Sequence, residues 1–215
     1  MTSGLVLEAA AVIAASLSAM ITAAKKKMDF VGVFALAVVT SFGGGTIRDL
    51  LIDRRPFFWV DRWEYLVIVF VLCVGFVYSR KLYEWSTTFV ARADIIDALG
   101  LGLFTISGTT LAAHAGLPPV VCALLGVVTT TGGGVMRDLI INEVPLLFQH
   151  GRMHATPALV GAALFLVLQR VGLSEPNSAL IATSFIVVVR LLALWLGTSL
   201  PRPHWLQTGR WQVPK

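Results

Sequence analysis

The chain is built from long apolar stretches that short polar segments separate. A helix needs about 20 apolar residues to cross a bilayer, and seven stretches approach that length. They are residues 5–24, 30–52, 66–78, 95–113, 119–141, 155–171 and 177–196. The third is the shortest, and the polar-aromatic residues 63–65 before it extend it into the headgroup layer. The pattern predicts an all-α, polytopic membrane protein with seven transmembrane helices.

Composition narrows the class further. Charged residues make up 13% of the chain, about half of the roughly 25% typical of soluble domains, so we expect a single transmembrane domain at 1–215 with a short C-terminal tail at 200–215. Cys73 and Cys122 lie within apolar stretches and form no disulfide or metal-ligand pattern. No nucleophile elbow, P-loop or dinucleotide fingerprint occurs. We therefore expect no enzyme activity, catalytic residue, cofactor or metal.

The positive charges predict an orientation. Loops facing the cytoplasm carry an excess of Lys and Arg, and an outside N-terminus leaves ten of them inside and four outside. The inside set is Lys25, Lys26, Lys27, Arg80, Lys81, Arg92, Arg152, Arg202, Arg210 and Lys215, and the outside set is Arg54, Arg55, Arg62 and Arg170. The prediction is a multi-pass protein of the cell membrane with its C-terminus in the cytoplasm. Because the basic residues are scattered, no nucleic-acid partner is expected.

One motif occurs twice. Gly-Gly-Gly-x-x-Arg-Asp at 43–49 returns 89 residues later at 132–138, and the same offset aligns Glu8 with Asp97 and Ser18 with Ser107. This predicts internal repeats at 8–81 and 97–170, with a seventh helix at 176–197 left over. Three spans per repeat make the copies enter the membrane in opposite directions, as in many transport proteins. A duplication that serves packing alone is the alternative.

The glycine triplets and the charges after them mark the candidate site. Gly43, Gly44 and Gly45, and likewise Gly132, Gly133 and Gly134, predict an unwound turn within each span, because glycine is a poor helix former. Close helix packing is the alternative interpretation. Freed backbone groups at that depth must face protein or a water-filled cavity.

Two Arg-Asp pairs follow the triplets at membrane depth. Arg48, Asp49, Arg137 and Asp138 together raise the free energy by on the order of 10 kcal/mol if lipid surrounds them. We expect them to pair across the pseudo-two-fold axis, Arg48 with Asp138 and Arg137 with Asp49, or to line a wet pore. A purely stabilising ion-pair network is the alternative.

Hydroxyl groups precede each triplet. Thr40 and Ser41 come before the first, and Thr129, Thr130 and Thr131 before the second. Their oxygens suit a partly dehydrated cation, although bonding back to the helix is an equal alternative. We place Glu8 and Asp97 at the membrane interface. Arg190 in the last span either snorkels to the inner headgroups, which we favour, or closes the bundle near the pore.

The paired motif, the 3 + 3 + 1 arrangement of spans and Arg190-Leu-Leu-Ala together resemble the prokaryotic members of the TRIC family, the trimeric intracellular cation channels. The resemblance covers nearly the whole chain. It implies a homotrimer with one pore per protomer, lined by second and fifth helices that kink at the glycine triplets. It also implies conduction of monovalent cations such as K⁺ or Na⁺ and contact with membrane lipid. Bacterial members have also been labelled glycine transporters.

Our functional hypothesis is a potassium-permeable cation channel. An arginine in a cation path repels the ion unless a carboxylate neutralises it, which gives Asp49 and Asp138 a role in conduction or stability. A secondary transporter of a small zwitterion such as glycine is the first alternative, because inverted repeats and half-helix ends suit it equally. A non-conducting scaffold held by membrane ion pairs is the second.

Overall fold

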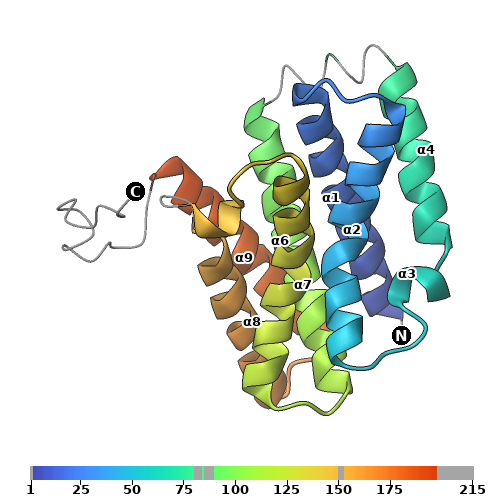
Figure 1. Cartoon of the computed structure of the whole chain (residues 1–215). Helices are drawn as coiled ribbons and strands as arrows, with labels where there is room; N and C mark the ends of the chain where they lie inside the picture. Colours follow the sequence, from blue (N-terminus) through green and yellow to red (C-terminus); the bar gives the residue numbers. More distant parts are fainter. Residues whose placement is uncertain (1, 80–83, 85–89, 150–152, 198–215) are drawn as a thin grey trace, which may run out of the picture.

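The computed structural model describes residues 2–79, 84, 90–149 and 153–197 (Figure 1). Within them the chain forms α-helices, one 3₁₀ helix and no strand. The elements are α1 (Thr2–Lys25), α2 (Phe30–Leu51), α3 (Phe58–Asp61), α4 (Glu64–Tyr78), α6 (Val90–His114), α7 (Pro119–Ile140), η1 (Leu146–Phe148), α8 (Ala155–Arg170) and α9 (Glu175–Trp195). The all-α prediction is confirmed, and the predicted tail at 200–215 lies outside the described residues.

The longer helices have the composition of membrane spans. In the described part of the chain, α1, α2, α6, α7 and α9 are long and apolar enough to cross a bilayer, whereas α4 and α8 are apolar but shorter. Large apolar side chains also cover the outer surface, among them Val31, Val120 and Leu180. An apolar surface of this extent faces lipid rather than water. The protein is therefore a multi-pass membrane protein.

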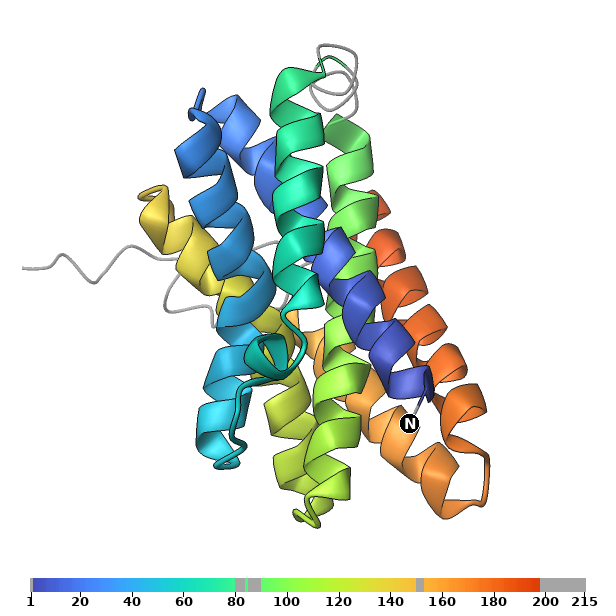
Figure 2. The same ribbon diagram turned by 90° about the vertical axis from the view of Figure 1, so that its right-hand side faces the viewer.

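The two halves of the bundle run in opposite directions. Figures 1 and 2 show α1 and α4 pointing one way and α2 the other, whereas α6 and α8 point against α1 and α7 points against α2. The N-terminus, α3 and the start of α9 lie at one end of the bundle, here called the α3 end. The start of α2, the end of α7 and η1 lie toward the opposite end, here called the η1 end.

The helices α2 and α7 end in the same turn. Arg54 N donates to Asp49 O at 2.8 Å and Glu143 N donates to Asp138 O at 2.8 Å, the bond that defines a Schellman cap. The turn needs one residue with positive φ, which Asp and Asn tolerate better than most. Asp53 supplies it at φ 54° and Asn142 at φ 57°. The two helix ends are thus built alike from positions 89 residues apart.

The glycine triplets are where α2 and α7 cross. A Cβ on Gly44 would collide with the carbonyl oxygen of Thr129 and lie 2.9 Å from its carbon, and a Cβ on Gly133 would collide with the carbonyl oxygen of Thr40. Both helices continue through their triplets. The predicted unwound turns are therefore wrong, because backbone packing against the partner helix holds the glycines in helical conformation.

Two apolar clusters support this crossing. One fills the space between α1, α2 and α4 and includes Met20, Leu36 and Val69. The other joins α6, α8 and α9 through Ile106, Phe165 and Ile186. Each cluster packs one half of the bundle, so the α2–α7 crossing and the contact between α1 and α6 join the halves.

The crossing predicts that only some of the triplet glycines are required. Gly44→Ala places its methyl group against the Thr129 carbonyl and should lower the free energy of unfolding by about 1–3 kcal/mol, the usual effect of overpacking. Gly134→Ala is the matched control, because its Cβ meets nothing within 4 Å. Thermal unfolding in detergent, followed by tryptophan fluorescence, measures both. Equal melting temperatures for the two variants would contradict the crossing.

Candidate functional site

Each arginine of the motif pairs with the aspartate beside it. In α2, Arg48 donates from Nε to Asp49 Oδ1 at 2.9 Å, and its Nη2 lies 2.8 Å from the same oxygen. In α7, Arg137 donates from Nε to Asp138 Oδ1 at 2.8 Å, with Nη2 also at 2.8 Å. The pair in α2 is completely enclosed, with 1% of Arg48 and none of Asp49 exposed. Each copy therefore neutralises its own charge.

The predicted pairing across the pseudo-two-fold axis is wrong, and the crossing explains why. Arg48 follows Gly44 by four residues and Arg137 follows Gly133 by four, which is about 6 Å of helix rise. Because α2 and α7 run in opposite directions, the two arginines leave the crossing toward opposite ends of the bundle. The carboxylate within reach of each guanidinium is then its sequence neighbour.

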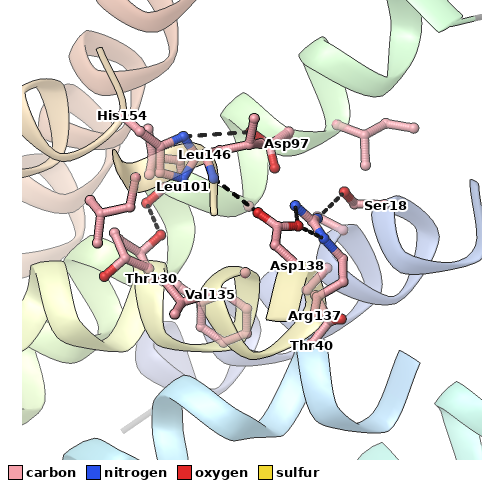
Figure 3. Close-up of a pocket in the computed structure, with 18 residues that line it drawn as sticks. Ser18, Thr40, Asp97, Leu101, Thr130, Val135, Arg137, Asp138, Leu146 and His154 are labelled. Atoms are coloured by element: carbon pink, nitrogen blue, oxygen red, sulfur yellow. Dashed lines mark hydrogen bonds and ion pairs between the residues drawn. The ribbon is translucent and has the colours of Figure 1, made fainter. Parts of the chain in front are cut away.

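The second oxygen of each aspartate binds the loop that follows its helix. Asp49 Oδ2 accepts from Phe58 N at 2.7 Å, and Asp138 Oδ2 accepts from Leu146 N at 3.0 Å (Figure 3). The first bond holds α3 against the end of α2, and the second holds η1 against the end of α7. Both aspartates thus join a buried arginine to the loop beyond their own helix.

The outer partners of the arginines come from α1 and α6. Arg48 Nη1 lies 3.8 Å from Glu8 Oε1, and Ser107 Oγ donates to the same oxygen at 3.5 Å. Arg137 Nη1 donates to Ser18 Oγ at 3.2 Å. Glu8 is buried beside these groups, and its position at the membrane interface stays a prediction. The sequence analysis aligned Ser18 with Ser107 but assigned neither of them to the site.

Arg190 closes the bundle rather than snorkelling to the headgroups. Only 1% of the residue is exposed. Its Nη1 donates to Met153 O at 2.8 Å, and its Nη2 lies 3.8 Å from Asp97 Oδ2. The preferred snorkelling interpretation is wrong, because these oxygens from α6 and from the segment before α8 compensate the charge inside the protein.

The predicted hydroxyl groups divide into two kinds. Thr40, Thr129 and Thr131 donate to the carbonyl four residues earlier at 2.6–2.7 Å, which is the back-bonding alternative. Ser41 Oγ donates instead to Val12 O at 3.3 Å, and Thr130 Oγ1 donates to Leu101 O at 3.1 Å. The last two bonds tie α2 to α1 and α7 to α6 at positions again 89 residues apart.

A cavity of about 40 Å³ lies between α1, α2, α6 and α7 toward the η1 end. We call it the η1 cavity (Figure 3). Its polar walls are formed by Ser18, Thr40, Asp97, Thr130, Thr131, Arg137, Asp138 and His154, with Gly134, Leu146 and Leu147 also exposed to it. Hydroxyl oxygens, carboxylates and one paired arginine thus face a shared space.

His154 stands at the mouth of this cavity, directly before α8. Its Nδ1 lies 3.8 Å from Asp97 Oδ2. Burial lowers the pKa of its imidazole, although the Asp97 carboxylate opposes that effect. Burial thus disfavours a positive charge on the His154 ring. The sequence analysis did not identify it, because a lone histidine near the start of a span has no motif around it.

A second recess, of about 320 Å³, lies toward the opposite end. We call it the α3 recess. Its walls are formed by Leu7, Glu8, Arg54, Asp61, Arg62, Ser107, Thr110, Leu111, His114 and Glu175. Glu8 and Ser107 are the members of this wall that also belong to the contacts around Arg48. The η1 cavity thus reaches α2 and α7, whereas the α3 recess lies between α1, α6 and the α3 segment, and its Glu8 contacts Arg48.

Only part of the predicted site faces these spaces. Thr40, Thr130, Thr131, Gly134, Arg137 and Asp138 line the η1 cavity. The others take part in packing: Ser41, Gly44, Gly45, Arg48, Asp49, Thr129 and Gly133 are buried, Gly43 lies against Met136 and Gly132 against Gly44. The second motif is therefore open to the cavity and the first is sealed.

A protein-family model and several bacterial membrane proteins match this chain in sequence. A family model described as "Glycine transporter" matches the chain twice, at residues 5–81 and 94–170. The UPF0126 inner membrane protein YadS of Escherichia coli is 35% identical over 150 residues, which are 68% of this chain and 69% of that protein. A UPF0126 membrane protein of Vibrio cholerae is 30% identical over 189 residues, covering 86% and 77%.

Solved structures show the same fold. The TRIC trimeric intracellular cation channel orthologue from Rhodobacter sphaeroides matches with a TM-score of 0.83 and 30% identity, covering 92% of this chain and 100% of that one. A prokaryotic TRIC channel solved in 0.5 M KCl matches with a TM-score of 0.82 and 28% identity, covering 92% and 98%. The chain therefore belongs to the family that unites the UPF0126 membrane proteins with the prokaryotic TRIC channels.

Proposed function

We propose that this protein is a potassium-permeable channel for monovalent cations, with one pore in each protomer of a homotrimer. The observation that carries the proposal is a pair of spaces at opposite ends of the bundle, one reaching the second Arg-Asp pair and the other reaching Glu8, which contacts Arg48 of the first. The likeness of this chain to solved structures of cation channels supports the same function. No step of this function requires a catalytic residue, a cofactor or a resident metal.

The proposed ion path runs from the α3 recess past Glu8 and Ser107, through the crossing, and into the η1 cavity. Oxygens of Thr40, Thr130 and Asp97 then replace part of the hydration shell of K⁺ or Na⁺. The bidentate contact with Asp138 neutralises Arg137, so the arginine does not repel the ion. The carboxylates of the path also favour cations over anions.

The proposal includes the inverted repeats, 8–81 and 97–170, with α9 as the seventh span and α4 and α8 as the short ones. The opposite directions of the two halves and the bonds repeated 89 residues apart support it. We also propose bends at the glycine triplets, membrane lipid around the trimer, and an outside N-terminus. Lys25, Lys26 and Lys27 would then meet the cytoplasm at the η1 end.

A carrier of a small zwitterion is the second candidate. The name of the matching family model favours it, and so does the η1 cavity, which offers the Asp97 carboxylate to an ammonium group and Arg137 to a carboxylate. A carrier binds its substrate from one side at a time, so its transport saturates, whereas an open channel passes many ions at each opening.

Recordings from purified protein in a planar bilayer separate the two candidates. The channel predicts discrete unitary currents in symmetrical KCl, with reversal potentials in a KCl gradient that follow the cation. In parallel, proteoliposomes loaded with unlabelled glycine are tested for counterflow of labelled glycine. Absence of unitary K⁺ currents together with saturable glycine counterflow would overturn the channel proposal in favour of the carrier.

The Arg137–Asp138 pair in the η1 cavity should control the unitary K⁺ conductance. Asp138→Asn leaves Arg137 without its carboxylate, so the cavity gains a positive charge and the unitary K⁺ conductance should fall several-fold. Breaking a buried ion pair also destabilises a protein by roughly 3–5 kcal/mol. The melting temperatures of the variants and the wild type in detergent therefore show whether a variant is still folded. Asp49→Asn is the matched control for unitary conductance, which it should leave unchanged because Asp49 lies outside the cavity wall.

A double variant separates charge from stability. Arg137→Gln with Asp138→Asn removes both charges and keeps hydrogen-bonding groups at both positions, so conductance should recover toward the wild-type value. Conductance that stays low in the double variant while it unfolds at the wild-type temperature would contradict the electrostatic role.

A further inference from the structure

The two halves of the bundle differ at one pair of equivalent positions. A Cβ on Gly45 would collide with Cε1 of Phe58 and lie 2.9 Å from its Cδ1. A Cβ on Gly134, 89 residues later, would meet nothing within 4 Å. The space beside the first Arg-Asp pair is therefore filled, and the space beside the second is open.

Phe58 fills that space as part of an aromatic cluster. Only 1% of the residue is exposed. Its ring centroid lies 5.9 Å from that of Phe42 in α2 and 6.3 Å from that of Tyr65 in α4. The guanidinium carbon of Arg48 lies 5.2 Å from the centroid of the same ring. Phe58, packed against Phe42 and Tyr65, thus covers the guanidinium of Arg48.

The second half carries other residues at these three positions. The offset of 89 places Thr131 at the position of Phe42, Leu147 at that of Phe58 and His154 at that of Tyr65. All three of these residues line the η1 cavity. The loop bonds of the two motifs differ by one residue, since Asp49 binds Phe58 N whereas Asp138 binds Leu146 N, the equivalent of position 57. Smaller or more polar side chains thus stand beside the second motif where aromatic rings stand beside the first.

The α3 recess consequently ends short of the first motif. Glu8 and Ser107 belong to its wall, whereas their equivalents Asp97 and Ser18 share the η1 cavity with the whole second Arg-Asp pair. The aromatic cluster lies where the equivalent continuation of the recess would be. The second Arg-Asp pair thus borders a cavity, whereas the first is separated from the α3 recess.

We propose that Phe58, held by Phe42 and Tyr65, is the gate of this protein at the α3 end, and that the pathway opens when Phe58 leaves Gly45. This inference rests on the proposed function, because it assigns a gate to that pathway. The short helix α3 begins at Phe58 and ends at Asp61, which lines the α3 recess together with Arg62. The recess provides room into which the ring can move. The bond from Phe58 N to Asp49 Oδ2 holds the closed position.

The first test is a pair of matched substitutions recorded in planar bilayers. Phe58→Leu introduces the residue found at the equivalent position, and its smaller side chain loses an aromatic contact. The open probability should therefore rise about fivefold, the shift expected from losing one aromatic pair. Phe57→Leu makes the same substitution one residue earlier, where the ring stacks on exposed Arg55, and should leave the open probability unchanged.

The second test measures access directly and does not depend on current. Ser41 and Thr130 are equivalent positions, and each is replaced by cysteine in a protein whose Cys73 and Cys122 are changed to alanine. Silver ion, which is small and binds thiolates, is added from one side of proteoliposomes of known orientation. The cysteine at 130 should react from the η1 side in every variant. The cysteine at 41 should react from the α3 side only when Phe58→Leu is also present.

The outcomes separate the gate from the channel. Silver access to position 41 that depends on Phe58, without K⁺ current in any variant, would retain the gate and reject the channel. Currents with wild-type open probability and unchanged silver protection in a folded Phe58→Leu protein would overturn the gate and retain the channel. If Phe58→Leu does not fold, Leu147→Phe is the reciprocal variant, which should reduce the current and protect position 130, and failure of both effects overturns the gate.

Discussion

The contact between two glycine-rich helix segments governs this structure. Gly44 and Gly133 bring α2 and α7 so close that the carbonyl groups of Thr40 and Thr129 occupy the places of absent side chains. Close backbone approach of this kind is a main source of stability between helices in a membrane, where no hydrophobic effect drives them together. The crossing places the two halves of the bundle and sends each Arg-Asp pair toward a different end.

The charges follow from that geometry. A buried guanidinium that cannot reach across the crossing needs an anion on its own helix, and the next residue supplies it. Each aspartate then uses its second oxygen to hold the loop beyond the helix. One carboxylate thus compensates a buried charge and positions α3 or η1, the two segments that decide whether the neighbouring space is filled or open.

The sequence predicted the all-α membrane fold and the positions of both motifs, because hydropathy and spacing along the chain carry that information. The predicted helix breaks were wrong, because three adjacent glycines allow either a break or a close crossing, and only the partner helix decides between them. The predicted ion pairs were wrong, because the opposite directions of α2 and α7 separate the two arginines. The sequence also did not predict the burial of Arg190, because the oxygens that contact its guanidinium belong to Asp97 and Met153, which are distant in sequence. His154 and Phe58 become notable only when the equivalent positions of the repeat are compared in space.

Aromatic rings thus cover the first Arg-Asp pair of this bundle, and a cavity borders the second. We propose that ions pass through the η1 cavity beside Gly134. The most direct measurement is the K⁺ current of Gly134→Cys in a cysteine-free protein, before and after a positively charged methanethiosulfonate reagent is added at the η1 end. The account predicts that modification abolishes most of the current. A current unchanged after complete modification would contradict it.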